Sequence, residues 1–217
     1  MLLELGCRVD CTDGSFGTLA EIVVEPATNR VTHLVVDPDE EDWLARLVPV
    51  ERAEAGAGEP RTIKLAGTVA DVRDYPAARE AAYLRLGEFP VEEGEWDVGD
   101  QSVVAVPLYN PPNDLEATPL EFAVAIDRVP SGEVSLRRTS PVETSDGYRV
   151  GEVGGVALDA KHRIGHLVVA LRRTPRTGPR RQHVAVPVSA LVGVMPDKAT
   201  LLWTKDEAAD LPDLPSP

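Results

Sequence analysis

The 217-residue chain contains an internal repeat, and this feature restricts its possible folds more than any other. The clearest block is residues 30–36, which align with residues 163–169. The two segments share Arg, His, Leu, Val and Val at matching positions. Agreement at several blocks in one order indicates two copies of one supersecondary unit, at residues 1–70 and 134–206. The other aligned blocks are 1–5 with 134–138, 13–17 with 146–151, 48–50 with 186–188, and 62–65 with 200–203.

Local patterns within each copy are typical of β-strands. An Asp-Gly pair at residues 13–14 and again at 146–147 separates apolar segments, and it favours a hairpin turn because Gly adopts positive φ at little cost. Short runs of Val, Leu and Ile recur at intervals of roughly 8–15 residues, as in small barrels and sandwiches. Gly17 and Gly151 predict a bulge or a tight bend, with simple turn glycines as the alternative.

The strand at residues 30–36 is apolar on both sides. Alternation places Leu34 and Val36 on one face and Val31, His33 and Val35 on the other. A small isolated barrel would leave one of these faces in water, and its core would be thin. We therefore expect the two barrels to pack on the middle segment, on each other, or on both.

The middle segment, residues 71–133, belongs to neither copy. Its Ala-rich stretch 77–85 predicts a short helix that ends before Gly87, and residues 102–108 and 120–127 predict a pair of strands. The Pro-rich residues 207–217 predict a disordered tail. The expected fold is mainly β, with two small β-barrels in tandem joined by a mixed segment that contains a short helix.

Each copy also shows one ordered set of features: an apolar strand, an Asp-Gly turn, a Gly before a long strand, an acid-bearing turn, an apolar strand and a Pro-containing strand. In this order the repeat unit resembles the PRC-barrel, a small β-barrel found in the photosynthetic reaction centre H subunit and in a ribosome maturation factor. The resemblance implies an adaptor or assembly module with no shared catalytic residue. The residues that carry it are Asp13, Gly14, Gly17, 33–36 and Pro49, and Asp146, Gly147, Gly151, 166–169 and Pro187.

Charge and hydropathy restrict the partners and the compartment. The formal net charge of −14 disfavours general binding to nucleic acid or to an anionic membrane, because both would repel the chain. No apolar run approaches the roughly 18 residues needed to cross a bilayer, and the first residues lack the pattern of a secretory signal. We expect a cytoplasmic protein without a membrane span. Cys7 and Cys11 would lie about 13 Å apart on an extended strand, too far for a disulfide.

The residue patterns do not predict an enzyme or a metal site. His162 and His166 are four residues apart, a spacing that converges on a helix but not on the turn and strand expected here. His33 and His166 hold the same place in the two copies, which indicates a shared packing role. The sequence has no nucleophile elbow, phosphate loop or paired-histidine zinc helix. We expect no catalytic residue, no metal and no cofactor.

The two copies differ most in the loop before the Pro-containing strand. Residues 37–42 of the first copy are strongly acidic, whereas residues 172–181 of the second copy are rich in arginine. Drift on a solvated surface is one interpretation of this difference. A site that binds a partner is the other. Its candidate residues are Arg172, Arg173, Arg176, Arg180 and Arg181.

Two functions follow from the second interpretation. In the first, the arginines bind an acidic protein surface, including residues 37–42 of another copy, and the chain is a non-enzymatic adaptor or assembly protein that binds proteins or itself. In the second, they bind RNA phosphates in an RNA- or ribosome-associated factor. Charge favours the first, since a chain of net charge −14 without these five arginines would carry −19. An enzyme with its site where the middle segment meets the barrels is the least favoured alternative.

Overall fold

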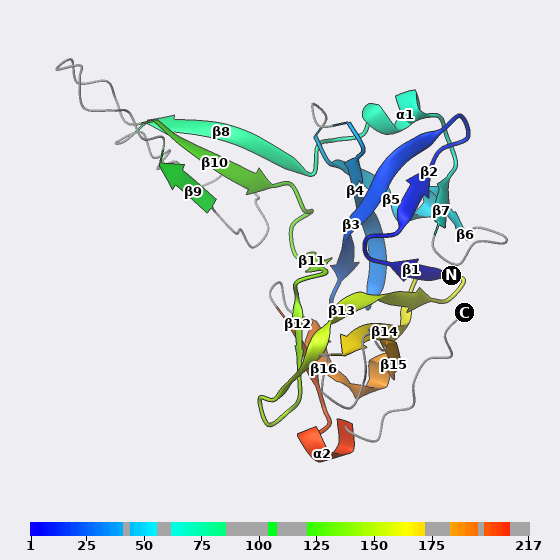
Figure 1. The fold of residues 1–217 in the computed structure, drawn as a ribbon, viewed down its shortest axis with the longest axis vertical. Coiled ribbons are helices and arrows are strands. Elements are labelled where there is room, and N and C mark those ends of the chain that lie inside the picture. The colour runs from blue at the N-terminus through cyan, green and yellow to red at the C-terminus, as the bar shows by residue number, and fades with distance from the viewer. Residues whose placement is uncertain are drawn as a thin grey trace.

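The computed structural model describes residues 1–40, 44–55, 62–85, 104–107, 121–171, 183–194 and 198–208. Two seven-stranded sheets and one three-stranded sheet account for most of this part of the chain, together with two short helices (Figure 1). The expected fold class, mainly β with barrel-like sheets and little helix, is confirmed. None of the described helices is long and apolar enough to span a membrane.

The first seven-stranded sheet is formed mainly by the first copy of the repeat. Its strands are β2 (Arg8–Asp10), β3 (Ser15–Glu25), β4 (Arg30–Pro38), β5 (Arg46–Pro49), β6 (Ala53–Ala55), β7 (Thr62–Leu65) and β11 (Val134–Arg137). They are ordered β5-β4-β3-β2-β7-β6, with β11 paired to β3. The 3-10 turn η1 (Val50–Arg52) joins β5 to β6, and α1 (Val69–Arg73) follows β7.

The second seven-stranded sheet repeats this topology strand for strand. Its strands are β12 (Pro141–Glu143), β13 (Arg149–Leu158), β14 (Ile164–Leu171), β15 (His183–Pro187), β16 (Leu191–Val194), β17 (Ala199–Leu201) and β1 (Leu2–Glu4). They are ordered β15-β14-β13-β12-β17-β16, with β1 paired to β13. The turn η2 (Val188–Ala190) and the helix α2 (Lys205–Ala208) take the places of η1 and α1.

The first strand of each copy belongs to the sheet of the other copy. Leu3 of β1 lies opposite Val156 of β13, and Leu136 of β11 lies opposite Ile22 of β3. Figure 1 shows β1 running beside β13 where the two barrel-like sheets meet. Each sheet therefore contains chain from both copies, and the repeat boundaries 1–70 and 134–206 cross the sheets instead of separating them.

The turns that connect the long strands also meet across this junction. The amide of Val31 donates to the carbonyl oxygen of His162 at 2.9 Å, and the amide of Ile164 donates to the carbonyl oxygen of Asn29 at 2.8 Å. Asn29 and His162 occupy equivalent positions and both have positive φ, 52° and 59°. The two hydrogen bonds are equivalent, so the junction has approximate twofold symmetry.

One hydrophobic core extends through both copies. The buried residues of both sheets form a single cluster, in which Leu3 and Leu136 are fully buried. A second, smaller cluster on the outer face of the first sheet joins Val35 of that sheet to Ala78 of the middle segment. The two sheets thus pack on each other, and the first sheet also packs on the middle segment, as the two apolar faces of strand 30–36 indicated.

Gly17 and Gly151 are required by a close approach of two strands. A Cβ atom at Gly17 would lie 1.8 Å from the carbonyl oxygen of Asp37, and one at Gly151 would lie 2.2 Å from that of Ala170. The strand register shifts beside each glycine, on the side of β2 and of β12. The predicted bulge is present in both copies, and a side chain at either position would prevent the neighbouring strands from pairing.

The predicted face of Val31 is wrong. Val31 is fully buried in the main core with Leu34, whereas Val35 belongs to the outer cluster. The reason is a register shift between β3 and β4, where Val24 lies opposite Val31 but the preceding Val23 lies opposite His33. A bulge interrupts the alternation of side chains, whereas the prediction from the sequence assumed regular alternation.

The third sheet shows that the predicted helix at residues 77–85 is also wrong. Its strands are β8 (Arg79–Arg85), β9 (Val104–Pro107) and β10 (Glu121–Asp127), in the antiparallel order β8-β10-β9. All seven residues of β8 pair with β10, and these hydrogen bonds override a helix propensity of only a few tenths of a kcal/mol per residue. The helix lies earlier, at α1, where Thr68 and Asp71 form a capping box.

Strands β9 and β10 confirm the predicted strand pair at 102–108 and 120–127.

The last aligned block needs a correction. Leu65 pairs with Ala53 and Leu201 pairs with Leu191, so Leu65 is equivalent to Leu201 and the predicted match of Thr62 with Thr200 is displaced. The connection between β6 and β7 is longer than that between β16 and β17, and this difference displaced the alignment. Of the predicted tail, 207–208 are helical and 209–217 lie outside the described residues.

Candidate functional site

The three-stranded sheet, which we call the arm, extends away from the two barrels (Figure 1). Its base is held on β5 of the first sheet by backbone hydrogen bonds. The amide of Leu47 donates to the carbonyl oxygen of Pro76 at 2.9 Å, and the amide of Ala78 donates to that of Ala45 at 2.8 Å. The chain that returns from the arm is also bound at this base, since the amide of Arg128 donates to the carbonyl oxygen of Ala78 at 2.8 Å.

Apolar packing supports this attachment. Val23, Val35 and Leu47 of the first sheet form the small outer cluster with Ala78, and Val129 packs against it. The outward chain and the returning chain of the arm therefore cover the same patch of the sheet. The docked chain therefore covers the outer apolar face of the first sheet around Val35, which is 1% exposed.

The second copy has smaller side chains at the equivalent positions. Ala157 replaces Val23 and Ala185 replaces Leu47, as the registers of β13 with β14 and of β14 with β15 show. Less apolar area is available there to stabilise a docked segment. The sequence therefore encodes one attachment point for the arm, on the first sheet.

A buried carboxylate lies at the centre of the arm base. Glu21 of β3 is 5% exposed in its side chain, and its Oε1 atom lies 3.0 Å from Nε of Arg137. The same Oε1 accepts a hydrogen bond from the guanidinium of Arg79, and Oε2 accepts one from the hydroxyl of Ser135. Arg79 begins β8, whereas Ser135 and Arg137 lie on β11. One carboxylate thus ties the arm and the exchanged strand to the first sheet.

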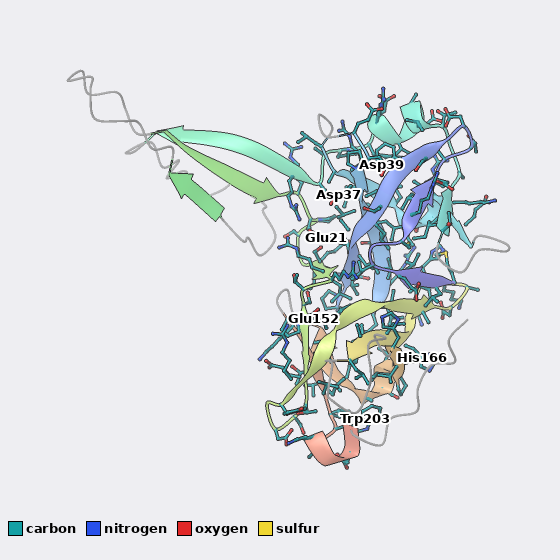
Figure 2. The ribbon with its side chains drawn as sticks, viewed as in Figure 1. Glu21, Asp37, Asp39, Glu152, His166 and Trp203 are labelled. Atoms are coloured by element: carbon teal, nitrogen blue, oxygen red, sulfur yellow. The ribbon has the colours of Figure 1, made fainter. Side chains whose placement is uncertain are left out.

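Asp37 of β4 belongs to the same group of charges. Burial raises the pKa of its carboxyl, the Glu21 carboxylate adds to this rise, and the Arg79 guanidinium opposes it. Figure 2 shows Glu21 and Asp37 on the side of the first sheet from which the arm extends. Arg79 therefore pairs with Glu21 and also opposes the rise in the pKa of Asp37 on the neighbouring strand.

A second polar contact ties the end of the middle segment to β4. The hydroxyl of Thr32 donates to Oε2 of Glu133, and Nδ1 of His33 lies 3.7 Å from the same oxygen. This Nδ1 atom is buried and makes no hydrogen bond. Glu133 directly precedes β11, so this contact helps to align the exchanged strand on the first sheet.

The residues singled out in the sequence lie apart from this site or outside the described part. Arg172, Arg173, Arg176, Arg180 and Arg181 lie outside the described residues, as do Glu41 and Asp42 of the acidic loop. The rest of that loop is described: Asp39 accepts a hydrogen bond from Ser15 at 3.0 Å, and Glu40 lies 3.8 Å from Arg73. Figure 2 labels Asp39 farther along the first sheet than Asp37.

The histidines do not converge. His33 is half-buried at the arm base, His166 is exposed on the second sheet, and His162 lies in the turn at the twofold junction. Among the described residues, no group of three or more His, Cys, Asp and Glu side chains could hold a metal ion. The equivalence of His33 and His166 in the two sheets is observed, but their surroundings differ.

Sequence reasoning missed the charges of the arm base. The available signal was Glu21, a charged residue inside the apolar run 19–24. A buried carboxylate needs a cationic or hydrogen-bonding partner, so its position predicts that some other segment supplies one. The partners themselves were not predictable, because Arg79 and Arg137 are far from Glu21 in the chain and from each other.

No protein-family model matches the sequence, and no curated protein matches it. The site is therefore interpreted from its geometry. Glu21 has both carboxylate oxygens engaged by guanidinium or hydroxyl groups. This arrangement suits a structural tie that fixes the position of the arm.

Proposed function

We propose that this protein is a non-enzymatic adaptor or assembly protein, built on two PRC-like barrels, that binds a protein partner through the arm. The observation that carries the proposal is the arm itself, a three-stranded sheet that extends from the barrels and is anchored by the Glu21 charges. In the described part, its strands make no more than marginal contact with other elements. Such a sheet is a structural platform with its surface directed away from the body.

The strand register divides the arm into two different faces. Leu84 lies opposite Phe122 and Ala82 lies opposite Val124, and alternation places these four residues on one face. Most positions of that face are apolar. Apolar positions gathered on one face of a projecting sheet are typical of a protein-binding surface.

The opposite face has charged positions that match each other. Arg85 lies opposite Glu121 and Arg79 lies opposite Asp127. Opposite charges in directly opposed positions stabilise a sheet face that contacts water. These charged pairs at the two ends distinguish this face from the face of Leu84 and Phe122, which is the one that we assign to the partner.

The two edges of the arm also differ. Strand β9 contains Pro107, which lacks a backbone donor. Strand β8 has 7 residues, and its pairing with β10 has no register shift. An edge without proline or bulge can accept an additional strand, so β8 offers a partner backbone hydrogen bonds next to the apolar face.

The PRC-like assignment of the barrels is supported by the order of their elements. Each copy has the Asp-Gly turn, a glycine where two strands approach closely, and a Pro at the end of the strand that precedes a 3-10 turn. In the resemblance noted above, this module serves as an adaptor or an assembly unit. An adaptor needs a stable body and a separate binding surface, and the barrels and the arm would supply one each.

Site-specific photo-crosslinking in the cells of origin tests the proposal. A photoreactive residue is placed at Ala82, on the apolar face, at Ala81, on the charged face, and at the exposed Leu202 of the second barrel. We expect one protein to be captured at Ala82 and not at Leu202. Capture should be lost with Val124→Glu and kept with the control Ala123→Glu. Capture of RNA at any of these positions would favour the RNA-associated alternative, and equal capture at Leu202 would contradict a role for the arm.

A further inference from the structure

Glu21 joins the first residue of the arm to strand β11, which follows the end of the arm after residues 128–133. Arg79 is the first residue of β8 and thus of the arm, whereas Arg137 is the last residue of β11, the strand that the second copy places on the first sheet. Both guanidinium groups bind the same carboxylate oxygen, Oε1 of Glu21. One shared acceptor therefore contacts both the base of the arm and β11.

Sharing an acceptor makes the two contacts interdependent. Arg79 is 44% exposed and Arg137 is 33% exposed in their side chains, whereas Glu21 is 5% exposed and depends on them for its neutralisation. If Arg79 moves away with the arm, Glu21 and Asp37 lose a positive charge that acts on both. Repulsion between these carboxylates then acts on the residues that hold β11, because Ser135 and Arg137 are the remaining partners of Glu21.

The effect of such a change would reach the junction between the barrels. Strand β11 carries Leu136, a fully buried residue of the common core, opposite Ile22 of β3. The end of the middle segment is fastened beside it by the contact of Glu133 with Thr32. The strand by which the second copy packs on the first sheet thus lies next to the anchor of the arm.

We infer that the protein contains a conformational coupling between the arm and the barrel junction, in which Glu21 transmits displacement of the arm base to strand β11. Tension or partner binding that moves Arg79 loosens β11. By the reciprocity of coupling, loosening β11 also weakens the attachment of β8. The coupling rests on the side-chain contacts of Glu21 and holds whether or not the arm binds the proposed partner.

Hydrogen exchange on the full chain, without any partner, tests the coupling. The variant Arg79→Ala is compared with Arg149→Ala, a matched control whose side chain is 43% exposed and ion-paired to Glu152 on the second sheet. We expect Arg79→Ala to increase the exchange rate of the β11 amides about tenfold, in the range of ordinary coupling effects. The control should leave these rates within about twofold of those of the unchanged protein.

The reciprocal variant completes the test. Arg137→Ala should accelerate the amides of β8, and in the double variant the unfolding constant should change at least about fivefold less than the product of the single effects. If Arg79→Ala affects only the arm, Arg137→Ala affects only β11, and the effects multiply, the two ion pairs are independent and the inference is overturned. If Arg79→Ala does not fold, the milder Arg79→Gln gives the same comparison. The crosslinking experiment can fail without changing these results, so the two proposals are separable.

Discussion

Glu21 and Gly155 occupy equivalent positions in the two sheets, one with a buried carboxylate and the other with no side chain. Glu21 lies opposite Arg137 of the incoming strand β11, and Gly155 lies opposite Glu4 of the incoming strand β1. The two junctions are alike in topology but different in chemistry. The first is fastened by charge, and the second depends on close backbone contact. Different substitutions should therefore weaken the two junctions.

Gly155→Ala should destabilise the second junction. An added Cβ atom would lie 2.1 Å from the carbonyl oxygen of Leu3, so β1 would have to move off β13. Overpacking of this kind costs about 3 kcal/mol in the free energy of unfolding. The measurement is urea denaturation followed by circular dichroism. The matched control is Gly193→Ala, where an added Cβ atom meets nothing within 4 Å and the stability should change by less than about 0.5 kcal/mol. Equal effects of the two substitutions would contradict the close contact of β1 with Gly155.

Glu21→Ala should destabilise the first junction, because it leaves Arg79 and Arg137 without their shared partner. Both arginines are partly exposed, so we expect a loss of about 2–3 kcal/mol in the free energy of unfolding, less than for a fully buried pair. Glu152→Ala, which removes an exposed ion pair with Arg149, should cost less than about 0.5 kcal/mol. Thermal denaturation of both variants measures the difference. A Glu21 variant as stable as the Glu152 variant would show that the buried carboxylate is not a tie.

Asp37→Asn should alter the dependence of stability on pH. Burial raises the pKa of Asp37 in the folded state, so folding favours the protonated form. Its contribution to stability is complete below the unfolded pKa and is lost as the pH rises through the higher folded pKa. The variant should therefore gain stability relative to the unchanged protein between acidic and neutral pH. Denaturation curves at several pH values measure this gain.

Asp159→Asn serves as a control of opposite sign. The amides of Lys161 and Arg163 donate to Asp159 at 2.7 and 2.9 Å, and these hydrogen bonds lower the pKa of its carboxyl. Its contribution is present above the unfolded pKa and is lost as the pH falls through the lower folded pKa. This variant should lose stability relative to the unchanged protein as the pH rises from strongly acidic to neutral. Parallel pH profiles for Asp37→Asn and Asp159→Asn would contradict the assigned directions.

Both thiols should react slowly with alkylating reagents. Burial is the main cause that raises the pKa of Cys7 and of Cys11 to about 11, from 9.0 for a free thiol. At pH 8 about one thiol in a thousand is then ionised, and alkylation by iodoacetamide should be on the order of a hundredfold slower than in the unfolded chain. The single variants Cys7→Ala and Cys11→Ala separate the two rates by mass spectrometry. Cys11, the more exposed, should react first, and rates equal to those in denaturant would disprove the raised pKa values.

Much of the fold follows from local patterns in the sequence. The Asp-Gly turns, the glycines at 17 and 151 and the apolar runs depend on the conformational preferences of neighbouring residues, and they identified the repeat and its strands. The same reasoning failed at residues 77–85, where pairing with the distant β10 overrides helix propensity. It also failed at Val31, where a bulge changes the face.

The exchange of β1 and β11 and the arm base could only be decided by the tertiary structure. Both exchanged strands are short and apolar at their centre, Leu3 and Leu136, so their pattern fits either sheet equally well. What distinguishes the sheets is the partner that each offers, the carboxylate of Glu21 for Arg137 and the bare backbone of Gly155 for β1. Local sequence specifies which segments are strands. Their pairing depends on side chains that are more than a hundred residues apart and meet only after the chain has folded.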